Sequence, residues 1–101
     1  MIDIRFKTRA KQQNIARLAS LLERIDPSIH YGKWIRVLMA IYFETDGSEE
    51  GFELADEWSS GGNNYMGTKD VRAKWRGLRL DLDKPVTIGT LIYMAKRSSV
   101  D

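Results

Sequence analysis

Apolar residues recur every three or four positions along most of the chain. This period places them on one face of an α-helix. The first such stretch predicts a helix from about Lys11 to Arg24, and its apolar face would consist of Ile15, Leu18, Ala19, Leu22 and Ile25.

A second helix is expected after Asp26 and Pro27, which fit an N-cap and a first-turn position. The helix proper begins near Tyr31. Its segment WIRVLMAIYF carries Arg36 as its one charged residue. Because a helix that is apolar on all sides avoids water, we expect this helix at the centre of a bundle.

A turn at residues 45–48 separates the second helix from a third. Gly47 suits the left-handed position after a helix, and Ser48 can cap the next helix. Glu49 and Glu50 then fall in a first turn, where the helix dipole favours carboxylates. The buried side of this third helix would consist of Phe52, Leu54, Ala55 and Trp58.

Two further helices follow a loop at residues 59–67. The fourth is expected to run from a Thr68 cap to about Leu80, and the fifth follows a Thr87 cap. The fifth helix has its apolar stripe at Ile88, Leu91, Ile92 and Ala95. Residues 1–10 and 98–101 are expected to be loosely ordered. The sequence therefore predicts an all-α fold, a single compact bundle of about five helices over residues 1–101, with a Gly/Asn-rich loop between helices three and four.

The composition fits one soluble domain with one core. The chain has 101 residues, no cysteine and one histidine, which argues against disulfides, zinc–thiolate sites and multi-histidine metal sites. No apolar run approaches the roughly 20 residues that span a bilayer, and no signal peptide is recognisable. We therefore expect a cytoplasmic protein without a membrane partner.

Charge is segregated along the chain although the net charge is only +2. Residues 1–10 form a basic N-terminal extension. Residues 41–60 carry seven acidic and no basic residues, whereas residues 61–80 carry five basic residues and one acidic residue. Such a dipolar surface suits a polyanion on its basic side and a basic partner on its acidic side.

The fourth helix is expected to have two stripes. Val71, Trp75 and Leu78 fall on one side and point to the core. A separate basic arc can contact phosphates and consists of Lys69, Arg72, Arg76 and Arg79, with Lys74 flanking the apolar stripe. The alternative is an ordinary solvated face.

The loop GGNNYMG is the second candidate binding element. Its glycines expose backbone N–H groups, and Asn63 and Asn64 can hydrogen-bond base edges or phosphate oxygens. Tyr65 offers a stacking face. The alternative is a surface connector whose Tyr65 folds onto the bundle. Trp58 and Trp75 are interpreted as core residues, and Trp34 as a core residue that tolerates partial exposure.

The sequence gives little evidence for a catalytic site or a metal site. Glu49, Glu53 and Glu57 share a helix face, but a carboxylate face is usually just solvated, so no metal or other cofactor is expected. His30 has no nucleophile or carboxylate constellation around it in sequence, and no P-loop pattern is present. We expect no independent enzyme.

The order of several segments resembles a known family. IDP is followed by YGKWIRVLMAIYFETDGSEEGFELADEWS, then by KDVRAKW and PVTIGTLIYMAK. Over about residues 20–97 this resembles the second of the families called primase C-terminal domains. The most specific segments are DEWS at residues 56–59, Lys74-Trp75 and TIGTL at residues 87–91.

The resemblance implies a helical module of phage, plasmid or mobile-element replication proteins. Such modules accompany a primase-polymerase or helicase domain. A non-catalytic role follows, in which the module binds single-stranded DNA template or nucleotide during primer initiation. The alternative is a protein–protein docking module that links primase and helicase through its acidic helix. A helix-turn-helix duplex binder ranks last, because the loop is longer than that motif's turn.

Overall fold

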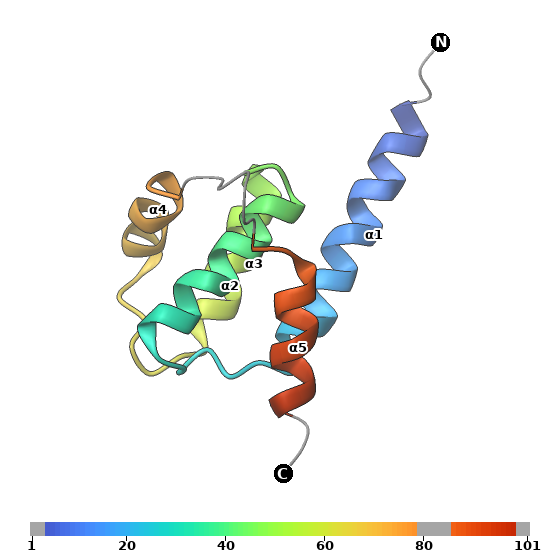
Figure 1. Cartoon of the computed structure of the whole chain (residues 1–101). Coiled ribbons are helices and arrows are strands. Elements are labelled where there is room, and N and C mark those ends of the chain that lie inside the picture. Colours follow the sequence, from blue (N-terminus) through green and yellow to red (C-terminus); the bar gives the residue numbers. More distant parts are fainter. Residues whose placement is uncertain (1–3, 79–85, 99–101) are drawn as a thin grey trace.

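Five helices make up the part of the chain that the structure describes. This computed structural model describes the backbone of residues 4–78 and 86–98, and the side chains of residues 13–78 and 86–97. The helices are α1 (Ile4–Leu22), α2 (Tyr31–Glu44), α3 (Glu49–Ser60), α4 (Thr68–Arg76) and α5 (Ile88–Ser98) (Figure 1). No strand occurs among these residues, so the predicted all-α bundle of about five helices is confirmed.

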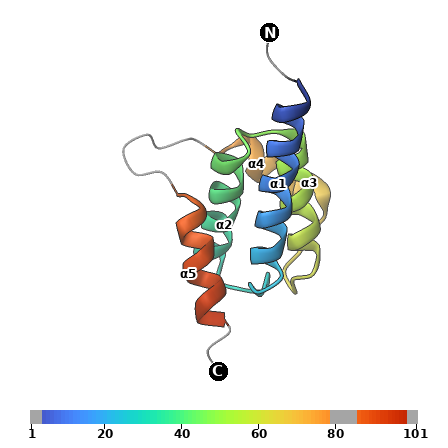
Figure 2. The ribbon, with the colours of Figure 1, turned by 90° about the vertical axis from the view of Figure 1, so that its right-hand side faces the viewer.

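Four of the helices form a closed ring around the core. α2 packs against α3 and α5, and α1 packs against the same two helices from the other side. α4 packs on α3 outside this ring (Figures 1 and 2). The buried residues of α2 are Val37, Leu38, Ala40 and Ile41, which confirms the prediction that this helix is central.

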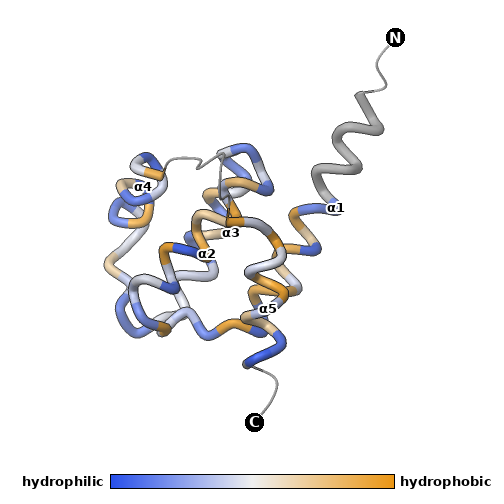
Figure 3. Tube along the Cα trace, viewed as in Figure 1, coloured by the Kyte–Doolittle hydropathy of each residue, from blue (hydrophilic) through white to orange (hydrophobic). Residues whose placement is uncertain are grey.

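The core takes apolar residues from every helix. In Figure 3, apolar positions recur along α2, α3 and α5. Leu18 of α1, Phe52 of α3, Val71 of α4 and Leu91 of α5 are each at most 3% exposed. Burial of such side chains is the main favourable term in the stability of a small bundle.

Three predicted helix boundaries are confirmed by their hydrogen bonds. Gly47 has φ 68° after α2, which is the left-handed conformation that favours glycine. Ser48 Oγ accepts a hydrogen bond from the Gly51 N–H at 3.1 Å and so caps α3. Thr87 Oγ accepts one from the Gly89 N–H at 3.3 Å at the start of α5.

Two predicted caps were wrong. Asp26 does not cap α2: its carboxylate accepts a hydrogen bond from the Ser28 N–H within a turn, and His30 is the N-cap of α2. Thr68 does not cap α4, because Gly67 occupies the N-cap position and the Thr68 hydroxyl donates to α3 instead. In both cases a side chain that fits a cap is used in another contact.

The ends of two helices also differ from the prediction. α1 begins at Ile4 and not near Lys11, so residues 4–10 of the basic extension are helical. α4 ends at Arg76, before Gly77, whereas the prediction extended it to about Leu80. Leu80 and the connector at residues 81–85 lie outside the described residues.

Candidate functional site

A pocket of about 390 Å³ opens where five segments meet. It lies between the turn at residues 26–30, the first turn of α2, the end of α3, the loop that leads into α4, and α4 itself. Its aromatic lining consists of Tyr31, Trp34 and Tyr65, and its polar lining includes Ser59, Asn64, Asp70 and Lys74. A mostly apolar cavity with a few polar groups is typical of a ligand site.

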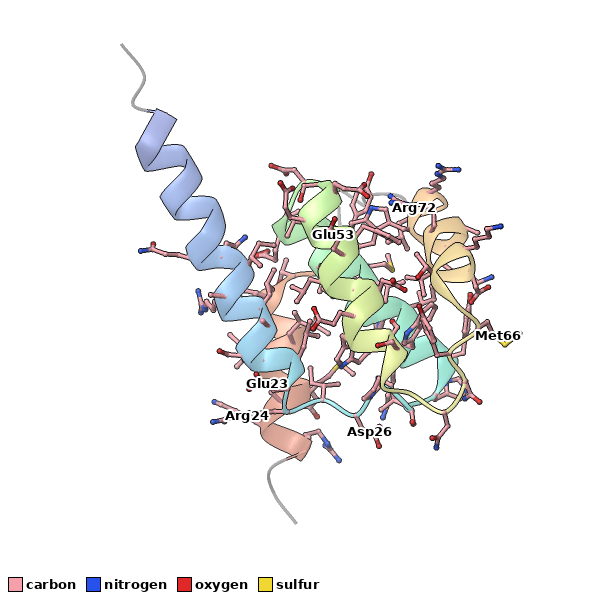
Figure 4. The ribbon with its side chains drawn as sticks, turned by 180° about the vertical axis from the view of Figure 1, so that it is seen from behind. Glu23, Arg24, Asp26, Glu53, Met66 and Arg72 are labelled. Atoms are coloured by element: carbon pink, nitrogen blue, oxygen red, sulfur yellow. The ribbon has the colours of Figure 1, made fainter. Side chains whose placement is uncertain are left out.

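The mouth of the pocket carries unusually exposed apolar side chains. Tyr31 is 58% and Met66 is 78% exposed, and both line the pocket. Met66 projects outward from the loop in Figure 4. Among the described residues, Tyr93 on α5 is the other large apolar side chain with comparable exposure. Exposed apolar surface next to a pocket is typical of an interaction or ligand-binding site.

Trp34 is held in a fixed orientation inside this pocket. Its indole N–H donates to Ser59 Oγ at 2.9 Å, and the side chain is half-buried. The Tyr31 ring lies beside it, with 5.7 Å between the ring centroids. The partial exposure expected for Trp34 is therefore confirmed, and the two rings together offer aromatic surface for stacking.

Asp56 on α3 fastens the loop to the bundle. Its carboxylate accepts hydrogen bonds from the Tyr65 hydroxyl at 2.8 Å and from Thr68 Oγ at 2.9 Å. The hydrogen bond with Thr68 lowers the pKa of Tyr65, but hydrogen bonding to Asp56, burial and the charge of Asp56 outweigh it and raise the pKa above its ordinary value. The Tyr65 hydroxyl therefore stays protonated and donates a hydrogen bond to the carboxylate.

The glycines of the loop allow a close approach to the turn at residues 26–30. A Cβ on Gly62 would lie 2.8 Å from the Pro27 carbonyl oxygen. The next residue, Asn63, donates its backbone N–H to Ser28 Oγ at 2.9 Å. Gly67 has φ 103°, which strongly favours glycine where the loop enters α4. The loop is therefore a fixed wall of the pocket.

The prediction of an open basic arc is wrong at Arg72, which is paired with a carboxylate of α3. Its guanidinium forms two hydrogen bonds with the Glu49 carboxylate, one of them at 2.9 Å, and lies 3.6 Å from the centroid of the Phe52 ring. The hydrogen bond lowers the pKa of Glu49 and raises that of Arg72. Arg72 therefore points at α3 (Figure 4) and is partly neutralised there.

The other basic residues of the fourth helix have different surroundings. Lys74 lines the pocket and lies 3.9 Å from the Asp70 carboxylate. Lys69 and Arg76 are exposed, and neither forms an ion pair within the described residues. Arg79 lies outside the described residues.

The structure thus brings together only part of the predicted site. Asn64, Tyr65 and Lys74 meet in the pocket, whereas Lys69, Arg72 and Arg76 do not line it, and neither does Asn63. Sequence reasoning missed Tyr31, Met66 and Asp70. The three-residue spacing of Tyr31 and Trp34 at a helix start is a signal that would have paired those two rings.

Trp58 and Trp75 are buried, as predicted for core residues. The indole N–H of Trp58 donates to the Ile25 carbonyl at 2.9 Å, between α3 and the segment after α1. The rings of Tyr42 and Phe52 pack against that of Trp75, with centroids at 5.0 and 6.0 Å. These two tryptophans are thus held by interior contacts.

Within the described ranges, no group of three or more His, Asp or Glu side chains is arranged to hold a metal ion. The same part of the chain contains no helix long and apolar enough to cross a membrane.

Comparison with known proteins gives one match. The family model described as Primase C terminal 2 (PriCT-2) matches residues 18–95. A comparison with curated proteins and a comparison with solved structures give no match. The matched range contains every residue of the pocket and leaves the first turns of α1 outside.

Proposed function

Because this chain belongs to the Primase C terminal 2 family, we propose that it acts as a non-catalytic accessory module that binds single-stranded DNA template or nucleotide in the pocket between α2 and α4. Its partner would be the primase-polymerase or helicase domain of a phage, plasmid or mobile-element replication protein. The family supports the replication context, and the pocket supports the choice of ligand.

One observation carries the proposal: the pocket combines accessible aromatic surface with a lysine. Tyr31 and Trp34 offer faces on which a base can stack, and stacking tolerates any base because each base has a π-face. Lys74 places a positive charge at the same pocket, where it can pair with a phosphate. Asn64 and Asp70 provide hydrogen-bonding groups for the edge of a base.

The exposed charges of α4 extend this site along a strand. Lys69 and Arg76 lie on the same helix as Lys74 and are open to solvent. If these three cations contact phosphates, the logarithm of the binding constant falls against the logarithm of salt concentration with a slope of roughly −2. Arg72 is left out of this count because Glu49 already occupies its guanidinium.

The role of the chain is to position its ligand. A rigid pocket that holds one base and its phosphate reduces the entropy that is lost when template and nucleotide are brought together. The fixed loop and the anchored Trp34 supply that rigidity. The chemical step would belong to the partner's catalytic domain.

The test is a titration of a fluorescein-labelled single-stranded oligonucleotide, with and without ATP, at low salt. Tyr31→Ala should weaken binding roughly 5- to 100-fold, the range expected for the loss of one base-stacking partner. Tyr93→Ala is the matched control, because that tyrosine is 60% exposed but lies on α5 away from the pocket. Lys74→Gln should weaken binding and flatten the salt dependence.

Two results would contradict the proposal. The first is that the intact chain does not bind the labelled oligonucleotide at low salt, either with or without ATP. The second is an equal loss of affinity in Tyr31→Ala and Tyr93→Ala, because that would place the ligand away from the aromatic pocket. Circular dichroism of each variant separates loss of binding from loss of fold.

A further inference from the structure

A second depression lies on a different face of α3, between α1 and α3. It has a volume of about 180 Å³, and we call it the α1–α3 groove. Ala19, Leu22, Leu54 and Trp58 supply its apolar lining. Figure 4 views the molecule from the side on which α1 and α3 lie next to each other.

Carboxylates flank this groove on both sides. Glu23, which directly follows α1, and Glu57 of α3 line it, and Glu53 lies one turn before Glu57 on α3. Figure 4 labels Glu23 and Glu53. All three are exposed, and none of them forms an ion pair within the described residues. Glu49 differs, because Arg72 already pairs with it. An apolar groove with an acidic rim favours a basic segment that also carries apolar side chains.

The chain itself contains such a segment. Residues 4–11, IRFKTRAK, hold four basic residues, no acidic residue and two large apolar ones. They lie before the family match, which begins at residue 18. The family match therefore does not account for their basic character.

This segment cannot reach the groove of its own molecule. α1 is one continuous helix from Ile4 to Leu22, and the groove is lined by the end of that same helix. At about 1.5 Å per residue, the first turns lie roughly 15–20 Å along the axis from the groove. A second copy can supply the segment without bending the helix.

We propose that two copies of this chain associate about a two-fold axis, with residues 4–11 of each copy lying on the α1–α3 groove of the other. Two antiparallel α1 helices would place the start of each beside the end of its partner, so both contacts form at once. Arg5 and Arg9 have the same four-residue spacing as Glu53 and Glu57, which allows two ion pairs per groove.

The competing occupant is a basic surface of a primase or helicase domain. In that alternative the groove is still a docking site, but the purified chain is a monomer. The proposal is independent of nucleic-acid binding, since the aromatic pocket lies on a different set of residues.

The experiment is sedimentation velocity of the 101-residue chain over a range of concentrations, at low and at high salt. The intact chain should dimerise, and the dimer should weaken with salt. Glu53→Lys with Glu57→Lys should raise the dimer dissociation constant at least about tenfold, because exposed pairs are individually weak but each change acts at both grooves. Arg5→Glu with Arg9→Glu should do the same.

Mixing the two double variants provides the decisive measurement. Each variant alone places like charges in contact, but in a mixed dimer both contacts again join opposite charges. The mixture should therefore dimerise although neither variant does. Lys69→Glu with Arg76→Glu is the control, since it changes two charges on α4 and should leave dimerisation unchanged. A monomeric intact chain, or a dimer indifferent to these exchanges, would overturn the proposal.

Discussion

Replacing Trp58 with phenylalanine tests whether this tryptophan is structural. Trp58 is 9% exposed, and its indole N–H donates to the carbonyl of Ile25, which is itself 3% exposed. Phenylalanine removes the donor and leaves that buried carbonyl without it, at a cost of about 1–3 kcal/mol. The smaller ring leaves a space that adds about 1 kcal/mol. We therefore expect the free energy of unfolding to fall by about 2–4 kcal/mol.

Urea unfolding followed by circular dichroism measures this loss, with oligonucleotide binding measured on the folded variant. A domain of this size has a total stability of about 5–15 kcal/mol, so the variant should still fold at low temperature. Trp34→Phe is the matched comparison: it removes a half-buried hydrogen bond to Ser59 and should cost about 0.5–1.5 kcal/mol. A Trp58→Phe variant of unchanged stability, or one that folds normally but loses binding, would refute the assignment.

Two further predictions concern the loop and the ion pair. Gly62→Ala should destabilise the protein by about 1–3 kcal/mol in urea unfolding, because the added Cβ meets the Pro27 carbonyl at 2.8 Å and backbone cannot move aside cheaply. In Gly61→Ala the added Cβ would meet a Pro27 side-chain carbon at 3.5 Å and the Trp58 carbonyl at 3.6 Å, which are ordinary contacts, so this variant should cost less; equal effects would argue against the close approach. The pKa of Glu49 is lowered by its hydrogen bond to Arg72, so this carboxylate adds stability above its ordinary pKa of 4.5 and loses that contribution as the pH falls below it. The difference in melting temperature between the intact chain and Glu49→Gln should therefore shrink between pH 6 and pH 3, and a constant difference would count against the pair.

The helices could be predicted because their signals are local. The apolar period of α2 and the cap at Ser48 each depend on residues a few positions apart, and both were confirmed. Two of the errors arose where a residue distant in the sequence hydrogen-bonds the side chain. Thr68 has the chemistry of a cap, but Asp56, twelve residues earlier, takes its hydroxyl. A helical wheel of α4 predicts the direction of the Arg72 side chain, but it cannot predict that the Glu49 carboxylate lies within hydrogen-bonding distance there.

The candidate site was harder to predict for the same reason. Its loop residues, Asn64 and Tyr65, were recognisable from composition, since glycine and asparagine mark an irregular segment. Tyr31 was not, because its exposure depends on how the turn at residues 26–30 meets the loop. Because five separate segments form the pocket, no single spacing in the sequence predicts its whole lining.

The DEWS segment at residues 56–59 positions parts of the pocket, although Ser59 is its one residue that lines the pocket. Asp56 holds the loop through Tyr65, Trp58 holds the segment after α1, and Ser59 fixes the indole of Trp34. Three side chains of one helix end thus fix three walls around the pocket. Because Asp56 does not line the pocket, its substitution should alter binding through the position of the loop, whereas a change at Tyr31 removes contact surface directly. An Asp56→Asn variant tests this indirect role. Its loss of affinity should accompany a loss of order in the loop and should not depend on the charge of the probe.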